Sequence, residues 1–227
     1  MGVVNLPFLF KSSEHAYEVL DGEIGQNLLK QLESQEIVGL SFMENGWRHL
    51  TTSEKKVEKP EDLDGMKIRT MENEVHMAAF KAMGASPTPM AWGEVYTSLQ
   101  QGVVDGQENP VPIVWTNLLH EVQDYYALTG HFYSPYVFAM SKPVMDKLTP
   151  EQQQIIKDAA KEVTQLEREL ITQQSNEQVE LLKEAGMDVY EVDRSAFQEA
   201  TLPVYEQYQD VFGKELIDQI LEIGNQY

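Results

Sequence analysis

The stretch GVVDGQENP, residues 102–110, places two β-branched residues ahead of four polar side chains that are held between glycine and proline. Paired valines are typical of a buried strand, and Gly and Pro fix the backbone of a turn more tightly than solvation alone requires. The pattern therefore predicts a short buried strand that runs into a turn. In open α/β sheets ligands lie outside the carboxyl ends of strands, so these polar groups are candidates for binding.

Segments on either side of this stretch alternate between helix-like and strand-like patterns. Apolar residues four apart predict a helix over 16–32, which leads into a strand in IVGLSF, 37–42. MKIRT, 66–70, predicts a strand, and a helix over 72–84 follows, whose Gly84 suits a left-handed cap. ASPTPMAW, 85–92, predicts a loop, and 93–102 predicts a helix. The alternation predicts an α/β fold.

The second half opens with a clear helix start. Thr149 is a suitable N-cap, Pro150 suits the first helical position, and Gln152 can complete a capping box. An unbroken helix over 151–185 would be roughly 50 Å long, which exceeds one small lobe. The polar run TQQSNEQ, 172–178, favours an exposed helix that bridges two lobes; a loop between two helices is the alternative. A strand in MDVYEV, 187–192, and helical segments over 197–208 and 216–223 end the chain.

Composition limits the class of partner and of chemistry. The formal net charge of −20 and the pI near 4.5 argue against nucleic acid, because phosphates require a basic face. The chain has no Cys, its five His have no metal-ligand spacing, and no catalytic or phosphate-binding motif is present. No apolar run reaches the length of a membrane span. The sequence predicts no metal, cofactor or catalytic residue, and an enzyme is the weakest of the functions considered.

Three residues suit the binding of a carboxylate. Arg48 in ENGWRHLTTS and Arg69 in MKIRT carry the planar fork that bonds a carboxylate through two parallel hydrogen bonds, and Asn109 can add a donor. Arg69 is the more informative arginine, because it ends a predicted strand instead of lying on a charged face. Trp92 is either an interlobe core residue or a flat apolar wall for a ligand. An anionic ligand would need such locally placed cations.

The segment GMKIRTMENEVHMAAFKAMGASPTPMAWGEVYTSLQQGVVDGQENP, residues 65–110, closely resembles the solute-binding proteins of tripartite ATP-independent periplasmic (TRAP) transporters. LPFLF, LDGEIGQNLL, ENGWRHLTTS and LTPEQQQIIKDAA extend the resemblance over nearly all 227 residues. The family implies a two-lobed, periplasmic-binding-protein-like α/β fold, with a long helix spanning both lobes and an organic acid bound between them. We assign 1–45 and 135–174 to lobe I, and 46–134 and 175–227 to lobe II.

The resemblance also implies roles for single residues. Arg69 resembles the arginine that clamps the ligand carboxylate, and Asn109 resembles the asparagine that bonds the same group. Arg48 looks like a second cationic contact, and Trp92 stands where an aromatic residue, commonly Phe, lies beside the ligand. His131 in LTGHFYS looks like a water-mediated or supporting polar contact. The candidate ligand-binding residues are Arg69, Asn109, Arg48, Trp92, His131 and Glu108.

TRAP membrane subunits are the implied partners, and the implied location is the periplasm or cell surface, although the first residues show no export signal. Family members begin with such a signal and a β-α-β segment that this sequence does not match. Lobe I is therefore expected to be incomplete, and the edge of IVGLSF is expected to be open to pairing with another chain as a homo-oligomer. The alternative function is a truncated, non-binding α/β remnant that self-associates.

Overall fold

The computed structural model describes all 227 residues and contains one mixed six-stranded sheet with nine α-helices around it. The strand order is β3-β2-β4-β1-β5-β6. The strands are β1 (Ile37–Thr52), β2 (Lys67–Thr70), β3 (Ser86–Pro89), β4 (Gly106–Asn109), β5 (Tyr125–Ser141) and β6 (Asp188–Tyr190). The helices are α1 (Ser13–Asp21), α2 (Glu23–Gln31), α3 (Glu74–Ala82), α4 (Val95–Gln100), α5 (Val111–Thr116), α6 (Lys142–Met145), α7 (Pro150–Glu184), α8 (Arg194–Phe212) and α9 (Lys214–Ile223). The α/β prediction is confirmed.

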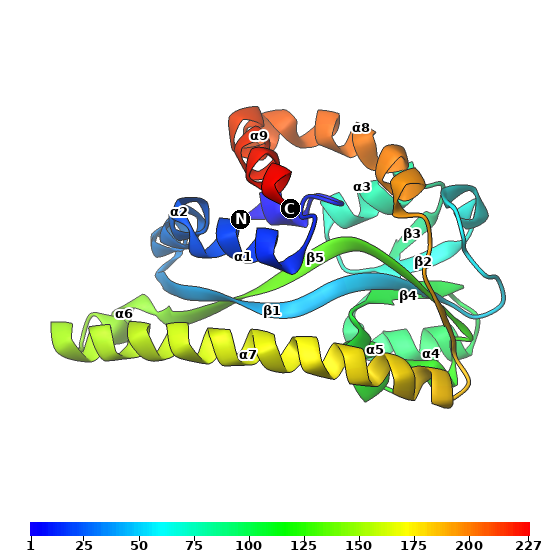
Figure 1. The fold of residues 1–227 in the computed structure, drawn as a ribbon, viewed down its shortest axis with the longest axis horizontal. Coiled ribbons are helices and arrows are strands. Elements are labelled where there is room, and N and C mark those ends of the chain that lie inside the picture. The colour runs from blue at the N-terminus through cyan, green and yellow to red at the C-terminus, as the bar shows by residue number, and fades with distance from the viewer.

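Two long antiparallel strands, β1 and β5, form the spine of the molecule. Figure 1 shows them running across it between α7 on one side and α1, α2, α8 and α9 on the other, with both termini on the latter side. The second half of β1 also pairs with β4, beyond which lie β2 and β3, while β6 pairs with the first half of β5. The sheet is therefore wide at one end of the spine and only two strands wide at the other.

Helix α7 confirms the prediction of one continuous bridging helix. It begins with Thr149 as N-cap and with Gln152 completing the capping box, and it runs for 35 residues without interruption. The polar segment 172–178 is helical, so the alternative of two helices joined by a loop is wrong. No helix of the fold combines the length and the apolar character that crossing a bilayer requires.

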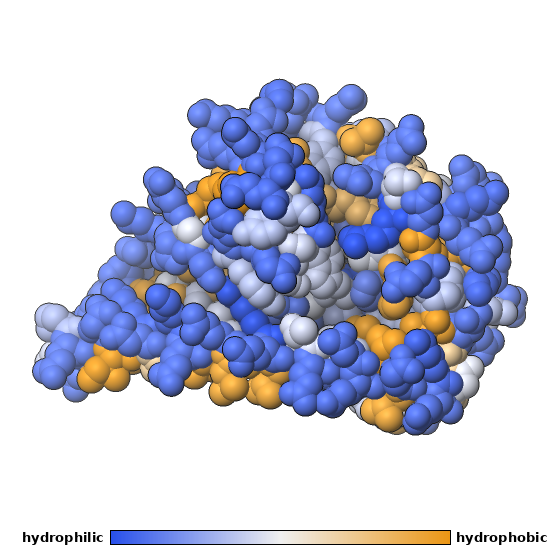
Figure 2. Space-filling model, in the orientation of Figure 1, coloured by the Kyte–Doolittle hydropathy of each residue, from blue (hydrophilic) through white to orange (hydrophobic).

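The face of α7 that meets β1 is polar. Arg168 Nη2 donates to the carbonyl oxygen of Phe42 at 2.6 Å, and the backbone N–H of Glu44 donates to Glu167 Oε2 at 2.9 Å. The apolar stripe of the helix faces solvent instead, and Figure 2 shows hydrophobic residues along the lower edge of the molecule, where α7 lies. The large exposed members of the stripe are Ile155, Val163, Leu166 and Leu170. Periodicity located the helix, but it did not show which face packs.

The helix predicted over 16–32 is two helices. Gly22 separates α1 from α2 with an extended backbone, and the i, i+4 stripe passes across this break. A Cβ on Gly25 would lie 1.8 Å from the carbonyl oxygen of Leu20, so glycine is needed where the two helices meet. The spacing alone could not reveal a break that close backbone packing requires.

Strand predictions were right in place and wrong in extent. IVGLSF is only the start of β1, so Arg48 lies within a strand and not in a connection. ASPTPMAW contains β3, a Pro-bearing edge strand that pairs only with β2, where missing N–H donors are tolerated. The pattern predicted no element over β5, the longest strand. Gly84 and Gly102 have φ of +93° and +66°, as expected at helix ends.

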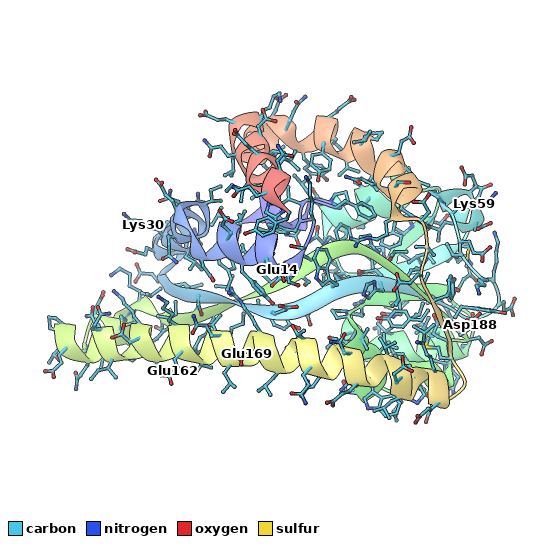
Figure 3. All side chains as sticks on the ribbon, viewed as in Figure 1. Glu14, Lys30, Lys59, Glu162, Glu169 and Asp188 are labelled. Carbon is cyan, nitrogen blue, oxygen red and sulfur yellow. The ribbon has the colours of Figure 1, made fainter.

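One hydrophobic core of 30 buried residues joins the helices near the termini to the sheet. It includes Val19 and Leu20 from α1 together with Leu50 and Ile68 from the sheet. Figure 3 shows charged side chains such as Glu162 and Glu169 pointing away from the body into solvent. Because the main core crosses the expected boundaries, it does not mark where one lobe ends, and the residue limits of the lobes stay a prediction.

Candidate ligand-binding site

Strand β4 carries the polar residues of the stretch GVVDGQENP. The strand is Gly106–Asn109, a few residues later than predicted, and Val103 and Val104 precede it. It pairs with β1 on one side and with β2 on the other, so Gln107, Glu108 and Asn109 are buried within the sheet. Buried polar groups require hydrogen-bond partners, and the neighbouring strands supply them.

Gly106 allows β4 to approach β1 closely. A Cβ at this position would lie 2.2 Å from the carbonyl oxygen of Thr51, although the backbone of Gly106 itself is ordinary. We expect Gly106→Ala to lower the free energy of unfolding in urea by about 1–3 kcal/mol, because the two strands must move apart. Gly93→Ala is the control, since nothing lies within 4 Å of its Cβ position. Equal stabilities of the two variants would contradict this explanation.

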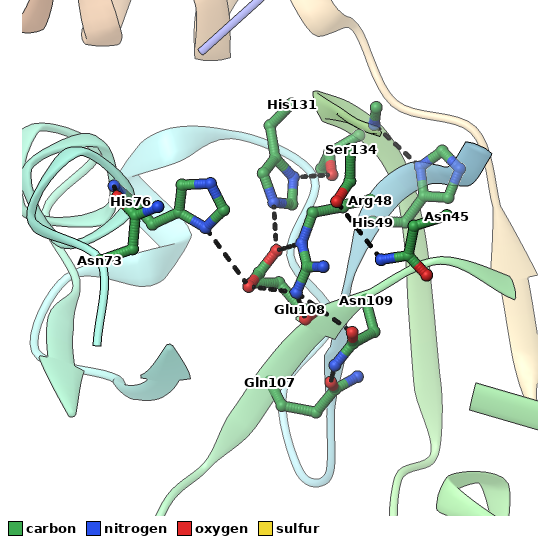
Figure 4. A network of polar contacts seen from close by, with 12 residues as sticks. Asn45, Arg48, His49, Asn73, His76, Gln107, Glu108, Asn109, His131 and Ser134 are labelled. Atoms are coloured by element: carbon green, nitrogen blue, oxygen red, sulfur yellow. Dashed lines mark hydrogen bonds and ion pairs between the residues drawn. The ribbon is translucent and has the colours of Figure 1, made fainter. Parts of the chain in front are cut away.

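Arg48 and Glu108 form a buried ion pair at the centre of the site. The two side chains are 2% and 0% exposed, Arg48 Nη2 donates to Glu108 Oε1 at 2.8 Å, and Arg48 Nε donates to Oε2. Nη2 also donates to the backbone oxygen of Glu108 at 2.9 Å. Figure 4 shows this bidentate pair with His131 and His76 on its other side.

Histidines complete the surroundings of the carboxylate. His131 Nε2 lies 3.3 Å from Glu108 Oε2, and its Nδ1 lies 2.6 Å from the Thr129 hydroxyl. Burial lowers the pKa of His131, so the neutral ring donates from Nε2 and accepts from Thr129. Burial alone would raise the pKa of Glu108, but the charge of Arg48 and the hydrogen bonds from His131 and Arg48 hold it well below its usual range.

His76 lies on the same side of Glu108. Its Nδ1 is 4.0 Å from Glu108 Oε1, and its ring stacks on Phe132 with centroids 4.0 Å apart. Burial lowers the pKa of His76 to about 3, so the ring is neutral at neutral pH. His76 therefore lines the ion-pair site. The sequence analysis did not single it out, because one His on the buried face of a helix forms no recognisable motif.

Asn109 links the ion pair to the end of β4. Its Oδ1 accepts from Arg48 Nη2 at 3.1 Å, and its Nδ2 donates to Gln107 Oε1 at 2.5 Å. The backbone oxygen of Asn109 accepts from the Tyr126 hydroxyl at 2.9 Å. The amide orientation is thereby fixed, and one N–H of Nδ2 has no acceptor in the protein. Gln107 is a second residue that the sequence analysis did not single out.

Arg69 lies at the carboxyl end of β2, the parallel neighbour of β4. Its Nε and Nη2 both donate to the backbone oxygen of Met90, at 3.1 Å and 2.7 Å, and no carboxylate lies within 4 Å of the guanidinium. The side chain of Trp92 covers it, with 5.5 Å from Cζ to the ring centroid. Burial lowers the pKa of Arg69. The negative charge of Glu108 raises this pKa and the positive charge of Arg48 lowers it, so the three charged groups interact.

The six predicted residues thus divide into two groups. Arg48, Glu108, His131 and Asn109 share one buried network, and Arg69 with Trp92 lies beside it. Trp92 is 40% exposed beside Arg69. A cavity of about 630 Å³ between α2, β1 and α7, and one of about 330 Å³ lined by His49 and Arg194, lie elsewhere; neither is lined by Arg69 or Trp92.

A mixed sheet with two long strands, a helix that runs along it and a buried guanidinium at a strand end agree with the two-lobed solute-binding class that the sequence resemblance implied. The model of the family "Bacterial extracellular solute-binding protein, family 7" (DctP) matches residues 1–210. The chain belongs to this family.

Several relatives are named for a ligand or have been solved with one bound. The chain is 39% identical over 217 residues to the 2,3-diketo-L-gulonate-binding periplasmic protein YiaO of Escherichia coli, covering 95% of the chain and 65% of that protein. A TRAP periplasmic solute binding protein from Polaromonas, bound to D-erythronate, has a TM-score of 0.93 at 43% identity, over 96% of this chain and 72% of that one. One from Sulfitobacter with bound β-D-galacturonate has a TM-score of 0.92 at 43% identity, over 99% and 74%.

These likenesses confirm the family resemblance and the fold class. The chain spans less than two thirds of the length of the curated relatives that it matches, and about three quarters of the solved structures. The family and its structural neighbours are solute-binding proteins. What the whole protein binds, and with what it assembles, is therefore a matter for proposal.

Proposed function

We propose that this chain is the acid-binding part of a periplasmic solute-binding protein of a TRAP transporter, without catalytic activity of its own. Arg69 is the observation that supports this most strongly. It is a buried, permanently charged guanidinium at the carboxyl ends of parallel strands, and it has no carboxylate within ion-pair distance. A guanidinium in such a place gains most from an anion that bonds it through two parallel hydrogen bonds.

The neighbours of Arg69 support a directed carboxylate clamp. The Met90 carbonyl oxygen holds Nε and Nη2 of the Arg69 guanidinium, whereas the N–H groups of Nη1 have no acceptor in the protein. Trp92 supplies a flat apolar wall, and the remaining N–H of Asn109 Nδ2 can donate to the same ligand. Arg48 can add only Nη1, because its other nitrogens are held by Glu108 and Asn109.

Glu108 acts differently from a direct ligand contact, whereas His131 keeps the supporting role that the resemblance implied. Glu108 is fully buried and negative, so it would repel an organic acid, and its oxygens already bond Arg48 and His131. We assign to Glu108 the role of holding Arg48 and, through Arg48, Asn109. His131 orients Glu108 from the opposite side. Both residues position the ligand contacts without touching the ligand.

The substrate class is a small organic acid, and a sugar acid in particular. Among the relatives described above, one is named for binding a keto sugar acid, and two have an aldonic acid and a uronic acid bound. All three present one carboxylate beside hydroxyl groups, which matches a guanidinium clamp with amide donors near it. The net charge of −20 repels anions at long range, so affinity depends on these local donors.

Arg69→Lys tests the function. We expect the affinity for D-erythronate, D-galacturonate or 2,3-diketo-L-gulonate, whichever binds best in a thermal-shift screen, to fall by about 1.5–3 kcal/mol in titration calorimetry. Lysine keeps the charge and loses the fork. Arg194→Lys is the matched control, because Arg194 also donates to a backbone oxygen, that of Gly130 at 2.8 Å, and lies 5.5 Å from the Trp47 ring.

Two outcomes would contradict the proposal. Equal affinities of wild type, Arg69→Lys and Arg194→Lys would show that the clamp lies elsewhere. Absence of any thermal shift with all three acids, at concentrations up to the millimolar range, would favour the non-binding remnant instead.

The remaining expectations go with this function. Lobe I at 1–45 and 135–174 and lobe II at 46–134 and 175–227 would close over the acid, and TRAP membrane subunits would receive it. Self-association through open strand edges stays a prediction, which sedimentation of the purified chain would test. A monodisperse monomer with cooperative unfolding would count against it.

A further inference from the structure

The apolar stripe on the solvent face of α7 is long and continuous. Val163, Leu166 and Leu170 are 46%, 56% and 46% exposed, and Ile155 nearer the start of the helix is 61% exposed. The orange residues along the lower edge of Figure 2 lie where α7 runs. Single exposed apolar residues are normal on a protein surface, whereas a contiguous row of them is typical of an interaction surface.

The central part of the stripe has the spacing of a coiled-coil seam. The seam consists of Ala159, Val163, Leu166 and Leu170, all exposed. The intervals are four, three and four residues, and an average near 3.5 residues keeps successive side chains facing a neighbouring helix. The residues that this part of α7 buries are Ala160, Thr164 and Arg168, which are not members of the seam. The seam is therefore free to contact another helix while α7 stays packed on β1.

Glutamates flank the seam. Glu162 and Glu169 are exposed and lie one heptad apart on one side of it, and Figure 3 shows both pointing into solvent. Glu167 lies on the other side, where its Oε2 accepts from the backbone N–H of Glu44 at 2.9 Å. These are the heptad positions that face the flanks of a partner helix, and no Lys or Arg occupies them over residues 159–170.

The flanking charges exclude a second copy of α7 as the preferred partner. In a parallel pair Glu162 of one copy would face Glu167 of the other, and in an antiparallel pair Glu162 would face Glu169. Like charges at these positions destabilise pairing, and the net charge of −20 adds repulsion between copies. The same charges disfavour an anionic lipid surface. A helix with basic flanks would convert each of these repulsions into an attraction.

We propose that the seam over 159–170 docks an amphipathic helix of another protein, which carries apolar residues at the facing heptad positions and Lys or Arg at the flanking ones. The apolar side chains would cover Val163, Leu166 and Leu170, and Glu162 and Glu169 would select the basic flanks. Apolar contact thus supplies affinity, and charge supplies the choice of partner. The proposal concerns a surface outside the candidate ligand-binding site, and it does not rest on the role of Arg69.

The probe for this surface is a synthetic helical peptide of about three heptads, with Leu at the two apolar heptad positions and Lys at the two flanking ones. Its acidic twin carries Glu in place of Lys. Titration calorimetry with the full 227-residue chain is expected to show a 1:1 complex with the basic peptide and an affinity at least tenfold lower for the acidic one. Because the whole chain is acidic, a variant must separate docking from general attraction.

Leu166→Glu makes this separation. It adds a negative charge at a 56% exposed position, so general attraction to the basic peptide would increase, whereas docking on the seam should weaken at least tenfold. Leu202→Glu, at a 54% exposed leucine on α8, is the matched control and should bind the basic peptide like the wild type. The double variant Glu162→Lys with Glu169→Lys should bind the acidic peptide more tightly than the basic one. Circular dichroism verifies that each variant folds.

Four results would overturn the proposal. One is the absence of a complex between the wild-type chain and the basic peptide, and another is equal affinity for the two peptides. The third is binding of the basic peptide that Leu166→Glu leaves unchanged or strengthens, which would show general attraction only. The fourth is a homodimer in light scattering that Leu166→Glu dissociates and Leu202→Glu does not, which would assign the seam to a second copy of the chain.

Discussion

Replacing Glu108 with Ala is expected to lower the free energy of unfolding by about 3–5 kcal/mol, because it leaves Arg48 charged and unpaired in a buried site. Arg48 is 1% exposed, and three of its recorded hydrogen bonds end on Glu108. His131 loses its acceptor in the same variant. Urea unfolding followed by circular dichroism measures the change.

Two further variants separate loss of the pair from loss of a side chain. The double variant Arg48→Met with Glu108→Leu should recover most of the stability, since apolar residues of similar volume often replace a buried ion pair without cost. Asp146→Ala, which breaks the exposed pair between Lys142 and Asp146, should have no measurable effect. A double variant as unstable as Glu108→Ala would show that cavity formation dominates and not the unpaired charge.

Lowering the pH is expected to destabilise the chain at pH values that are still above the range in which carboxylates titrate. The pKa of His76 is about 3 in the fold and about 6.5 when unfolded, so folding favours the neutral ring. The stability that this provides is complete above pH 6.5 and is lost as the pH falls from 6.5 toward 3. At pH 5 the loss from His76 alone amounts to about 2 kcal/mol.

His76→Phe tests this directly, because it keeps a flat ring against Phe132 and removes the titrating group. Its free energy of unfolding should fall less than that of wild type between pH 7 and pH 5, by about 2 kcal/mol. At pH 8 the two proteins should differ little. Identical pH dependences would show that His76 does not titrate over this interval.

The sequence predicted elements well where the signal was local. The capping box at Thr149 and the absence of Gly and Pro before Gly186 were enough to place α7, because helix initiation and continuation depend on neighbouring residues. The left-handed conformation of Gly84 at the end of a helix was predicted for the same reason. The break at Gly22 was missed because it depends on contact between Gly25 and Leu20, which the apolar spacing does not record.

The candidate site was predicted through resemblance more than through pattern. Arg69 at a strand end was visible from the residues alone, whereas the pairing of Arg48 with Glu108 was not. These two residues are 60 positions apart and meet only because β1 and β4 lie side by side in the sheet. Trp92 was predicted to be either a ligand wall or an interlobe core residue, and its role stays a prediction.

By itself the sequence determined the α/β class, the long bridging helix and the strand end that carries Asn109, because propensity, capping and glycine placement act over a few residues. Tertiary structure alone decided that Glu108 neutralises Arg48 and that the polar face of α7 meets β1. Each of these depends on which distant strands become neighbours, and burial then sets the charge and the partners of every polar group they carry.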